Sequence, residues 1–455
     1  MGRGTAADPA ARGRAARRRP GALVGNGEYT AAVAESGTYA ARTAPERPTA
    51  ARNPRNPTSG AVAARNGSDA ALDVVAQGDP EHSWQRVRYR RQRVARKILG
   101  WRSLQGCQHC HAHNTKTVAV WRSQPADGGR GGAWFTGLQT CGLVWVCPVC
   151  AERISRGRRR ELQEAADAAG RLGYRMVFVT LTVRHNRGMR LRPFLADLAK
   201  ARGRMTGWRA YRKIRSDWGS AGQIRALEVT HGENGWHPHL HELFFVRHST
   251  TEADLAELQA RIYTLWADAC RRVGLPEPDP EHGVLVQGGE AAGDYISKWG
   301  IDDEMAGSAK KQGRQGGRTP WQLLDGATEN PRDAALFREY AEAFRGRRQL
   351  HYSRGLREAF SLAPEQADLE LATDPPPEAV QVASIDPATW LAVQQHRAQP
   401  AVLEIAERCP GELEAFFRRL RRESFYKGNN LEYLYSLQEA GKWAYLGDCK
   451  IYFGG

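Results

Sequence analysis

The sequence predicts an α+β fold in which a central antiparallel sheet is covered by flanking helices, with a cysteine-rich segment on its N-terminal side. Two observations carry this prediction. Residues 224–230 form a strand-like run, and histidines recur at alternate positions soon after it, as they would on one face of a paired strand. Residues 193–218 and 253–273 instead space their apolar side chains as amphipathic helices do.

The composition favours a partner that carries negative charge. The chain has 455 residues, enough for about two to three domains, with a net charge of +16 and a sequence pI near 9.7. Such an excess indicates a nucleic acid or an anionic membrane surface. No apolar run approaches the roughly 20 residues of a membrane span, and the N-terminus has no signal-peptide core. We therefore expect a cytoplasmic protein without a membrane partner.

The two ends of the chain differ in composition from its middle. Residues 1–80 are mostly Ala, Arg, Gly, Pro and Asn, which cannot bury a core, so we expect a disordered basic tail. Residues 361–385 are acidic and proline-rich, as is typical of a linker. We expect residues 386–455 to form a small C-terminal module of unknown role, and residues 81–165 and 166–360 to form the two functional regions.

The first of these regions begins with a basic helix. Residues 86–99 place apolar side chains on one side of a helix and mostly arginine on the other. Few acids are available to balance these arginines. The helix is therefore at least as consistent with binding to backbone phosphates as with an ordinary solvated surface.

Two C-x-x-C pairs follow the basic helix, at a separation typical of a structural zinc site. Each pair forms a short knuckle, and four thiolates close on one tetrahedral ion. Cys141 or His109 can replace one of these ligands. A clustered set of cysteines suits a cytosolic Zn²⁺ site better than disulfides. We thus expect an N-terminal zinc knuckle, whose four ligands would be Cys107, Cys110, Cys147 and Cys150.

Three histidines lie at alternate positions in the second strand of the predicted hairpin. His237, His239 and His241 share one face of that strand. Two imidazoles held side by side on a rigid strand can chelate a divalent ion. Glu228, near the end of the preceding strand, reaches the same ion if the two strands pair. Mixed imidazole and carboxylate ligation suits Mg²⁺ or Mn²⁺ in an open site.

The segment His239-Leu240-His241, followed by apolar residues, resembles the histidine-hydrophobic-histidine motif of enzymes that nick single DNA strands. Within that superfamily the chain is similar to the rolling-circle replication initiators of Gram-positive plasmids, the type 1 group. The resemblance extends from about Cys107 to Arg357 and does not include the ends of the chain.

Three motifs carry this resemblance, and they occur in the same order as in the type 1 group. The first is an apolar strand rich in threonine, here residues 174–183. The second is the two-histidine strand. The third is a tyrosine followed by a lysine, here Tyr295 and Lys298, which we expect one turn apart on a helix. Cys147-Pro-Val-Cys150 is also similar to a cysteine motif that precedes the first strand in that group.

The resemblance implies a metal-dependent nick at the double-strand origin of a plasmid. Tyr295 would attack a DNA phosphate to give a 5′-phosphotyrosine and a 3′-hydroxyl that primes synthesis, with rejoining of the strand at termination. Lys298 and the metal ion would offset part of the cost of ionising the phenol. The implied partners are plasmid DNA, single-stranded at the nick, and the host helicase and polymerase.

Termination in the type 1 group uses a glutamate that activates water, four residues before the tyrosine. Here that position is Ala291, and the nearest glutamate is Glu290. We take Glu290 as the expected general base, with an irregular helix start needed to bring it near Tyr295. Asp294 is the alternative.

Two other functions compete with this interpretation. A relaxase or transposase of the same superfamily would share the histidines, but relaxases usually place the tyrosine before the histidines, and such transposases are usually far shorter. A non-catalytic, zinc-containing DNA-binding regulator would explain the cysteines and the charge. It would leave the alternating histidines without a purpose.

Overall fold

The computed structural model describes residues 83–123, 132–299, 317–375, 378–426, 442–446 and 449–453. The tail expected at residues 1–80 lies outside these ranges, as does part of the expected C-terminal module. Among the helices in the described ranges, none combines the length and the apolar character that a membrane span needs.

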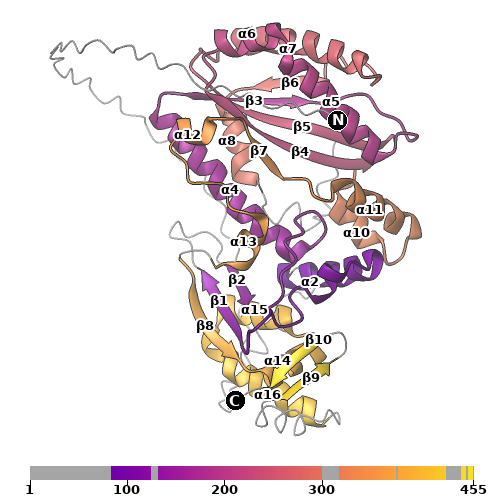
Figure 1. Cartoon of the computed structure of the whole chain (residues 1–455), viewed down its shortest axis with the longest axis vertical. Helices are drawn as coiled ribbons and strands as arrows, with labels where there is room; N and C mark the ends of the chain where they lie inside the picture. Colours follow the sequence, from indigo (N-terminus) through magenta and orange to yellow (C-terminus); the bar gives the residue numbers. More distant parts are fainter. Residues whose placement is uncertain are drawn as a thin grey trace, which may run out of the picture. The chain divides into compact units, whose positions relative to one another are not determined.

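The predicted histidine strand belongs to a five-stranded antiparallel sheet that has helices on both of its faces (Figure 1). Its strand order is β6-β3-β5-β4-β7. The prediction of an α+β fold with antiparallel strands and flanking helices is confirmed, and the strands form three sheets among the described residues. The strands are β3 (Arg175–Leu181), β4 (Gly222–Gly232), β5 (Gly235–Val246), β6 (Val284–Gln287) and β7 (Leu350–Tyr352).

The hairpin turn between β4 and β5 sets the register of the two strands. Gly232 pairs with Gly235 across a two-residue turn, so Glu228 lies directly opposite His239. Gly235 has a φ of 88°, and a Cβ there would lie 3.1 Å from the carbonyl oxygen of Asn186. Glycine meets both demands of this turn, because it adopts positive φ without strain and has no side chain. A slip by one residue would turn the histidines to the other face.

The two faces of the sheet pack against different helices. Leu240 and Phe244 of β5 belong to the core beneath α5 (Leu191–Gly207), α6 (Arg209–Asp217) and α7 (Glu252–Arg272). Leu243 and Phe245 alternate with them and belong to the core of the opposite face. His239 and His241 have the same parity as Leu243, so they lie on that second face. The helices there are α4 (Pro148–Arg171), α8 (Gly289–Lys298) and α12 (Leu356–Ala359).

The helix predicted over residues 193–218 is two helices, α5 and α6. The break is at Trp208, whose backbone is extended, with φ −76° and ψ 148°. Gly207 precedes it and has a low helix propensity. The break lets Tyr211 and Ile214 of α6 turn into the same core as α5.

The cysteine-rich region and the C-terminal region share one core. Strands β2, β1 and β8 form a second antiparallel sheet, and Trp390 packs edge-on against Phe135 at 5.0 Å between ring centroids. A third sheet pairs β9 (Lys442–Leu446) with β10 (Cys449–Phe453). The elements around the shared core include α2 (Trp84–Leu99), α3 (Arg102–Gly106), β1 (Val118–Ser123), β2 (Gly132–Thr136), α10 (Pro320–Gly326), α11 (Pro331–Phe344), β8 (Val380–Ile385), α14 (Pro387–Gln395), α15 (Gln399–Arg408) and α16 (Leu413–Tyr426).

Residues 361–385, which we expected to form a linker, carry two ordered elements. Helix α13 (Asp368–Thr373) buries Leu371, and strand β8 pairs with β1. The acids of this segment have specific partners. Arg158 of α4 lies 2.7 Å from Asp368, and Arg348 lies 3.1 Å from Glu365. The acidic composition therefore neutralises arginines of the fold, which composition alone does not distinguish from a solvated linker.

The arginines of α2 are used mostly within the protein. Arg91 is 1% exposed and forms a two-bond ion pair with Asp325. Arg88 lies 3.8 Å from Glu152, and Arg96 donates to the carbonyl oxygen of Leu104. Only part of the basic surface expected on this helix is therefore available to phosphates. Arg90, Arg93 and Lys97 are its exposed basic residues.

A buried acid on the α5 face provides a stability prediction. Glu242 is 1% exposed, its carboxylate is bonded by Arg202, and Arg225 lies opposite it in the strand register. Glu242→Gln should lower the free energy of unfolding by about 3 kcal/mol, because it removes the buried charge that the half-buried guanidinium groups of Arg202 and Arg225 face. Urea unfolding measures this. Glu257→Gln, which breaks an exposed pair with Arg261, should cost under about 1 kcal/mol. Equal losses in the two variants would contradict the prediction.

Candidate metal centre and nucleophile

Strands β4 and β5 bring one carboxylate and two imidazoles together. Glu228 lies opposite His239, and Ala226, two residues earlier in β4, lies opposite His241. The Nε2 atoms of both histidines are 3.4 Å from Oε2 of Glu228. One ligand atom from each of the three residues lies within 4.8 Å of the others, which fits a single cation. The structure thus groups the three residues that the sequence predicted as ligands.

Outer contacts hold both imidazoles in position. The Nδ1 atom of His241 is 3.0 Å from Oγ1 of Thr180, and Nδ1 of His239 donates to the carbonyl oxygen of His237 at 3.3 Å. These contacts occupy Nδ1 and direct Nε2 toward Glu228, as is common for histidines that bind metals. Thr180 was not among the residues predicted to belong to the site. The one feature of the sequence that could have indicated it is its position in the threonine-rich strand, which pairs with β5.

The charge on Glu228 is favoured by its neighbours. Burial by itself raises the pKa of this carboxyl, but the imidazoles of His241 and His239 lower it well below its usual value. The side chain is still 34% exposed, so a ligand can approach it. An ionised carboxylate beside two imidazoles is a suitable donor set for a divalent cation.

The third histidine of the row has a different environment. His237 stacks on His185, with 4.7 Å between the ring centroids and 13° between the ring planes. Burial lowers the pKa of His237 to about 4. It is therefore neutral at pH 7, and it lies outside the group formed by Glu228, His239 and His241.

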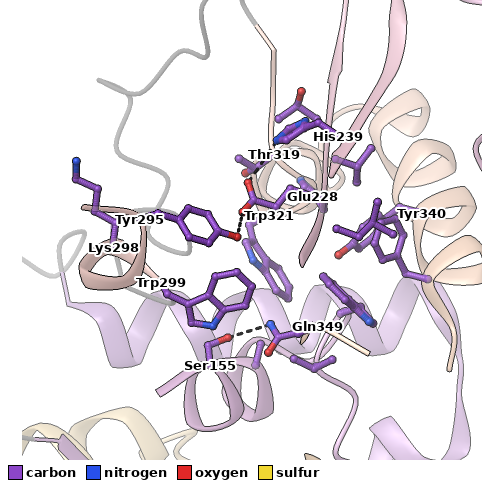
Figure 2. A pocket seen from close by; sticks show the side chains of 18 residues that line it. Ser155, Glu228, His239, Tyr295, Lys298, Trp299, Thr319, Trp321, Tyr340 and Gln349 are labelled. Atoms are coloured by element: carbon purple, nitrogen blue, oxygen red, sulfur yellow. Dashed lines mark hydrogen bonds and ion pairs between the residues drawn. The ribbon is translucent and has the colours of Figure 1, made fainter. Parts of the chain in front are cut away.

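Helix α8 places a phenol against this group. Oη of Tyr295 donates to Oε1 of Glu228 at 3.0 Å, while the imidazoles face Oε2 of the same carboxylate. The Tyr295 ring lies 5.1 Å from the His241 ring and 4.6 Å from the Phe178 ring, measured between centroids. Figure 2 shows the phenol pointing toward Glu228. The tyrosine and the two-histidine strand are thus adjacent.

The other two residues expected on α8 lie away from the phenol oxygen. Lys298 is 61% exposed, pairs with Asp294 at 2.9 Å, and extends away from the Tyr295 ring (Figure 2). Glu290 is exposed in the first turn of α8 and makes no hydrogen bond or ion pair with another described residue. Helical spacing had suggested a closer approach for Lys298, whereas Glu290 was expected near Tyr295 only with an irregular helix start. Asp294, one turn before Lys298, holds the ammonium group instead.

A cavity of about 220 Å³ opens beside the same residues. Glu228, His239 and Tyr295 line it, together with aromatic side chains from α4, α8, α10 and α11 or near them (Figure 2). No pattern in the sequence marks these aromatic residues as part of a site. They come from four distant segments, so no local pattern could connect them.

The cysteines form a second candidate metal site, and one ligand differs from the prediction. The Cys107 sulfur lies 3.7 Å from that of Cys147 and 3.5 Å from that of Cys150, and the Cys141 sulfur lies 3.6 Å from that of Cys150. Four thiolates around zinc at about 2.3 Å stand about 3.8 Å apart, so the group fits a tetrahedral ion. The group contains Cys141 and not Cys110.

The local chain path explains this correction. Residues after Cys107 turn sharply, with Gln108 at a φ of 53°. The carbonyl oxygen of His109 accepts a hydrogen bond from Nε1 of Trp390 at 3.0 Å, which ties this turn to the C-terminal region. Cys141 enters from the irregular segment between β2 and α4. Spacing in the sequence identified the cluster but could not decide between Cys110 and Cys141.

Comparison with known proteins agrees with the geometry. Residues 137–277 match the family described as "Replication protein", a range that includes Glu228, His239 and His241 and ends before Tyr295. No solved structure matches the chain significantly.

Named relatives are similar over longer or shorter parts of the chain. "Protein rep" of Streptomyces lividans is 31% identical over 313 residues, which is 52% of this chain and 68% of that protein. "Protein rep" of a Bacillus species is 34% identical over 28% of this chain and 41% of that protein. A Streptomyces cyanogenus protein named "Neomycin resistance protein" is 33% identical over 26% of this chain and 32% of its own length. The chain therefore belongs to the replication protein family of Gram-positive rolling-circle plasmids, and it is a plasmid replication initiator.

Proposed function

We propose that this initiator nicks one DNA strand at the double-strand origin through Tyr295 and later rejoins it. The observation that supports this most is the shared carboxylate of Glu228. Its Oε1 accepts the phenol hydrogen bond, and its Oε2 faces the imidazoles of His239 and His241. One residue thus couples the candidate nucleophile to the candidate metal ligands.

In the proposed nicking step, Tyr295 replaces the 3′ oxygen on the scissile phosphate. Oη of Tyr295 forms a bond to the phosphorus of the scissile phosphodiester, and the bond from phosphorus to the 3′ oxygen breaks. The phenol proton passes along the hydrogen bond to Glu228 Oε1, the departing 3′ oxygen takes a proton from water to become the 3′-hydroxyl primer, and Glu228 returns its proton to the solvent. The 5′-phosphotyrosine retains the phosphodiester linkage for the later transfer.

The two ligand groups are assigned different ions. Glu228, His239 and His241 would hold Mg²⁺ or Mn²⁺, which neutralises charge on the phosphate and polarises its P–O bond when bound. Cys107, Cys141, Cys147 and Cys150 would hold a structural Zn²⁺, because four thiolates leave no open position.

Lys298 and Glu290 would assist the reaction without forming the bond to phosphorus. Lys298, exposed on α8, would contact DNA phosphates near the nick and so favour the phenolate indirectly. Glu290 is proposed to activate water at termination, with Asp294 as the alternative. Plasmid DNA is the partner, and the host helicase and polymerase would act on the nicked product.

Metal removal and a ligand variant test this proposal. Purified protein should convert supercoiled origin plasmid to the nicked form with Mg²⁺ or Mn²⁺, and EDTA should stop the reaction. His239→Ala should slow nicking by at least about 100-fold, since loss of even an outer partner of a metal ligand costs 10- to 100-fold. Its thermal unfolding should be nearly unchanged, because only a partly exposed side chain is removed.

His248→Ala is a suitable control for the loss of an imidazole. His248 lies just beyond β5 and stacks on Trp218, away from the candidate site. This variant should nick at the normal rate. Origin binding without nicking in the wild-type protein, whichever divalent ion is supplied, would leave a non-catalytic DNA-binding regulator as the function.

A further inference from the structure

The cavity beside Tyr295 is lined by several aromatic rings. It lies between the sheet and the core shared by the cysteine-rich and C-terminal regions, and the side chains of Glu228 and Tyr295 form part of its lining (Figure 2). Stacked rings are the usual partners of bases from single-stranded nucleic acids. The aromatic residues that line the cavity, besides Tyr295, are Trp145, Trp299, Trp321, Tyr340 and Phe344.

The size of the cavity suits a single small ring system. Its volume is about 220 Å³. A protein cavity of about 150 Å³ is enough to hold benzene, whereas pockets for drug-sized ligands start at about 300 Å³. One nucleobase therefore fits, and a stacked pair of bases does not.

Two polar atoms around the cavity lack partners. Nε1 of Trp299 and Oε1 of Gln349 are buried without a hydrogen-bond partner among the described residues. The amide nitrogen of Gln349 is already used, since it donates to Oγ of Ser155 at 3.1 Å. Buried polar atoms normally have partners. Both atoms are fully covered, so they lie behind the cavity wall, and the aromatic rings form the surface that a bound base would contact.

We propose that this cavity receives one unstacked nucleobase, from a nucleotide next to the scissile phosphate. The position of that phosphate rests on the proposed nicking function; the binding of a base does not. A strand whose phosphate lies at Glu228 and Tyr295 has its neighbouring base within reach of the cavity mouth. Inserting that base between indole rings would fix the strand so that the phosphate faces the phenol, and it would discriminate single-stranded from paired DNA.

The test uses a thymidine pentanucleotide whose central base is 2-aminopurine, together with the same pentanucleotide with an abasic centre. The fluorescence of 2-aminopurine falls when the base stacks on aromatic rings. Wild-type protein should quench it and should bind the 2-aminopurine strand about 5- to 150-fold more tightly than the abasic strand, the range that one stacked base supplies. Equal affinity for the two strands, or unquenched fluorescence in the complex, would overturn the proposal.

A variant then identifies the cavity as the place of binding. Trp321→Ala should reduce the preference for the base-bearing strand to nearly onefold while leaving affinity for the abasic strand unchanged. Trp208→Ala is the matched control. Trp208 joins α5 to α6 on the other face of the sheet, where Arg272 lies over its ring. Trp208→Ala should keep the full preference for the base-bearing strand over the abasic strand. Loss of this preference in both variants would show that the base does not bind in the cavity.

The base-binding measurement and the nicking assay can succeed or fail independently of each other. Quenching and base preference without any nicking would support the cavity as a base-binding site and contradict the catalytic proposal. Nicking without quenching would support the catalytic proposal and contradict base binding in the cavity. Because the wild-type measurement needs no substitution, the proposal remains testable even if Trp321→Ala fails to fold.

Discussion

Tyr295→Phe should abolish nicking and the covalent protein–DNA adduct while leaving origin binding nearly intact. Only the hydroxyl group is removed, and it is the group hydrogen-bonded to Glu228. Loss of the nucleophile from other enzymes that form covalent intermediates lowers kcat by up to about 10⁶-fold, so we expect a loss of at least about 10⁴-fold. The ring contacts with Phe178, His241 and Trp299 remain, so the melting temperature should change little.

Single-turnover nicking of supercoiled plasmid measures the rate, and mass spectrometry of the adducted peptide identifies the nucleophile. Tyr263→Phe is the matched control. Tyr263 lies on α7, and its hydroxyl donates to the carbonyl oxygen of Pro278 on the opposite face of the sheet. That variant should nick normally and carry its adduct on Tyr295. An adduct that persists in Tyr295→Phe would remove Tyr295 from the mechanism.

The parts of the fold that depend on short-range patterns could be predicted from the sequence. The hairpin that pairs Glu228 with His239 follows from alternation and from a two-residue turn, both of which are local. The strand expected over residues 174–183 is found as β3 (Arg175–Leu181), and the helix expected at Tyr295 is found as α8. The proximity of Tyr295 to the histidines came from the resemblance, because no periodicity relates positions so far apart.

The parts that depend on long-range partners could not be predicted in this way. Strand β8 pairs with β1, and Arg158 pairs with Asp368, across more than two hundred residues of chain. Charge composition reports how many acids and bases are present but not which ones meet. The expected linker at residues 361–385 and the expected phosphate-binding surface of α2 both depended on composition alone. In each case ion pairs inside the fold account for part of these charges.

The cysteine cluster leads to the second prediction of large effect, because the structure and the C-x-x-C spacing name different ligands. Cys141→Ser should reduce bound zinc from about one equivalent to none and lower the free energy of unfolding by several kcal/mol. Structural zinc contributes about 10 to 16 kcal/mol in small zinc-binding domains, and here the ion would tie the start of α4 to the segment before β1 through Cys150 and Cys107. Metal analysis of the purified protein and thermal unfolding measure the two effects.

Cys110→Ser discriminates between the two ligand sets. It should retain zinc, since Cys110 lies outside the group whose sulfurs approach one another. Cys270→Ser serves as the control for loss of a buried thiol: Cys270 lies on α7 in the core of the opposite sheet face, where burial raises its pKa to about 12. It should keep the metal at some cost in packing. Loss of zinc from Cys110→Ser with retention in Cys141→Ser would restore the two C-x-x-C pairs as the ligands. The turn around Gln108 would then have to rearrange when the ion binds.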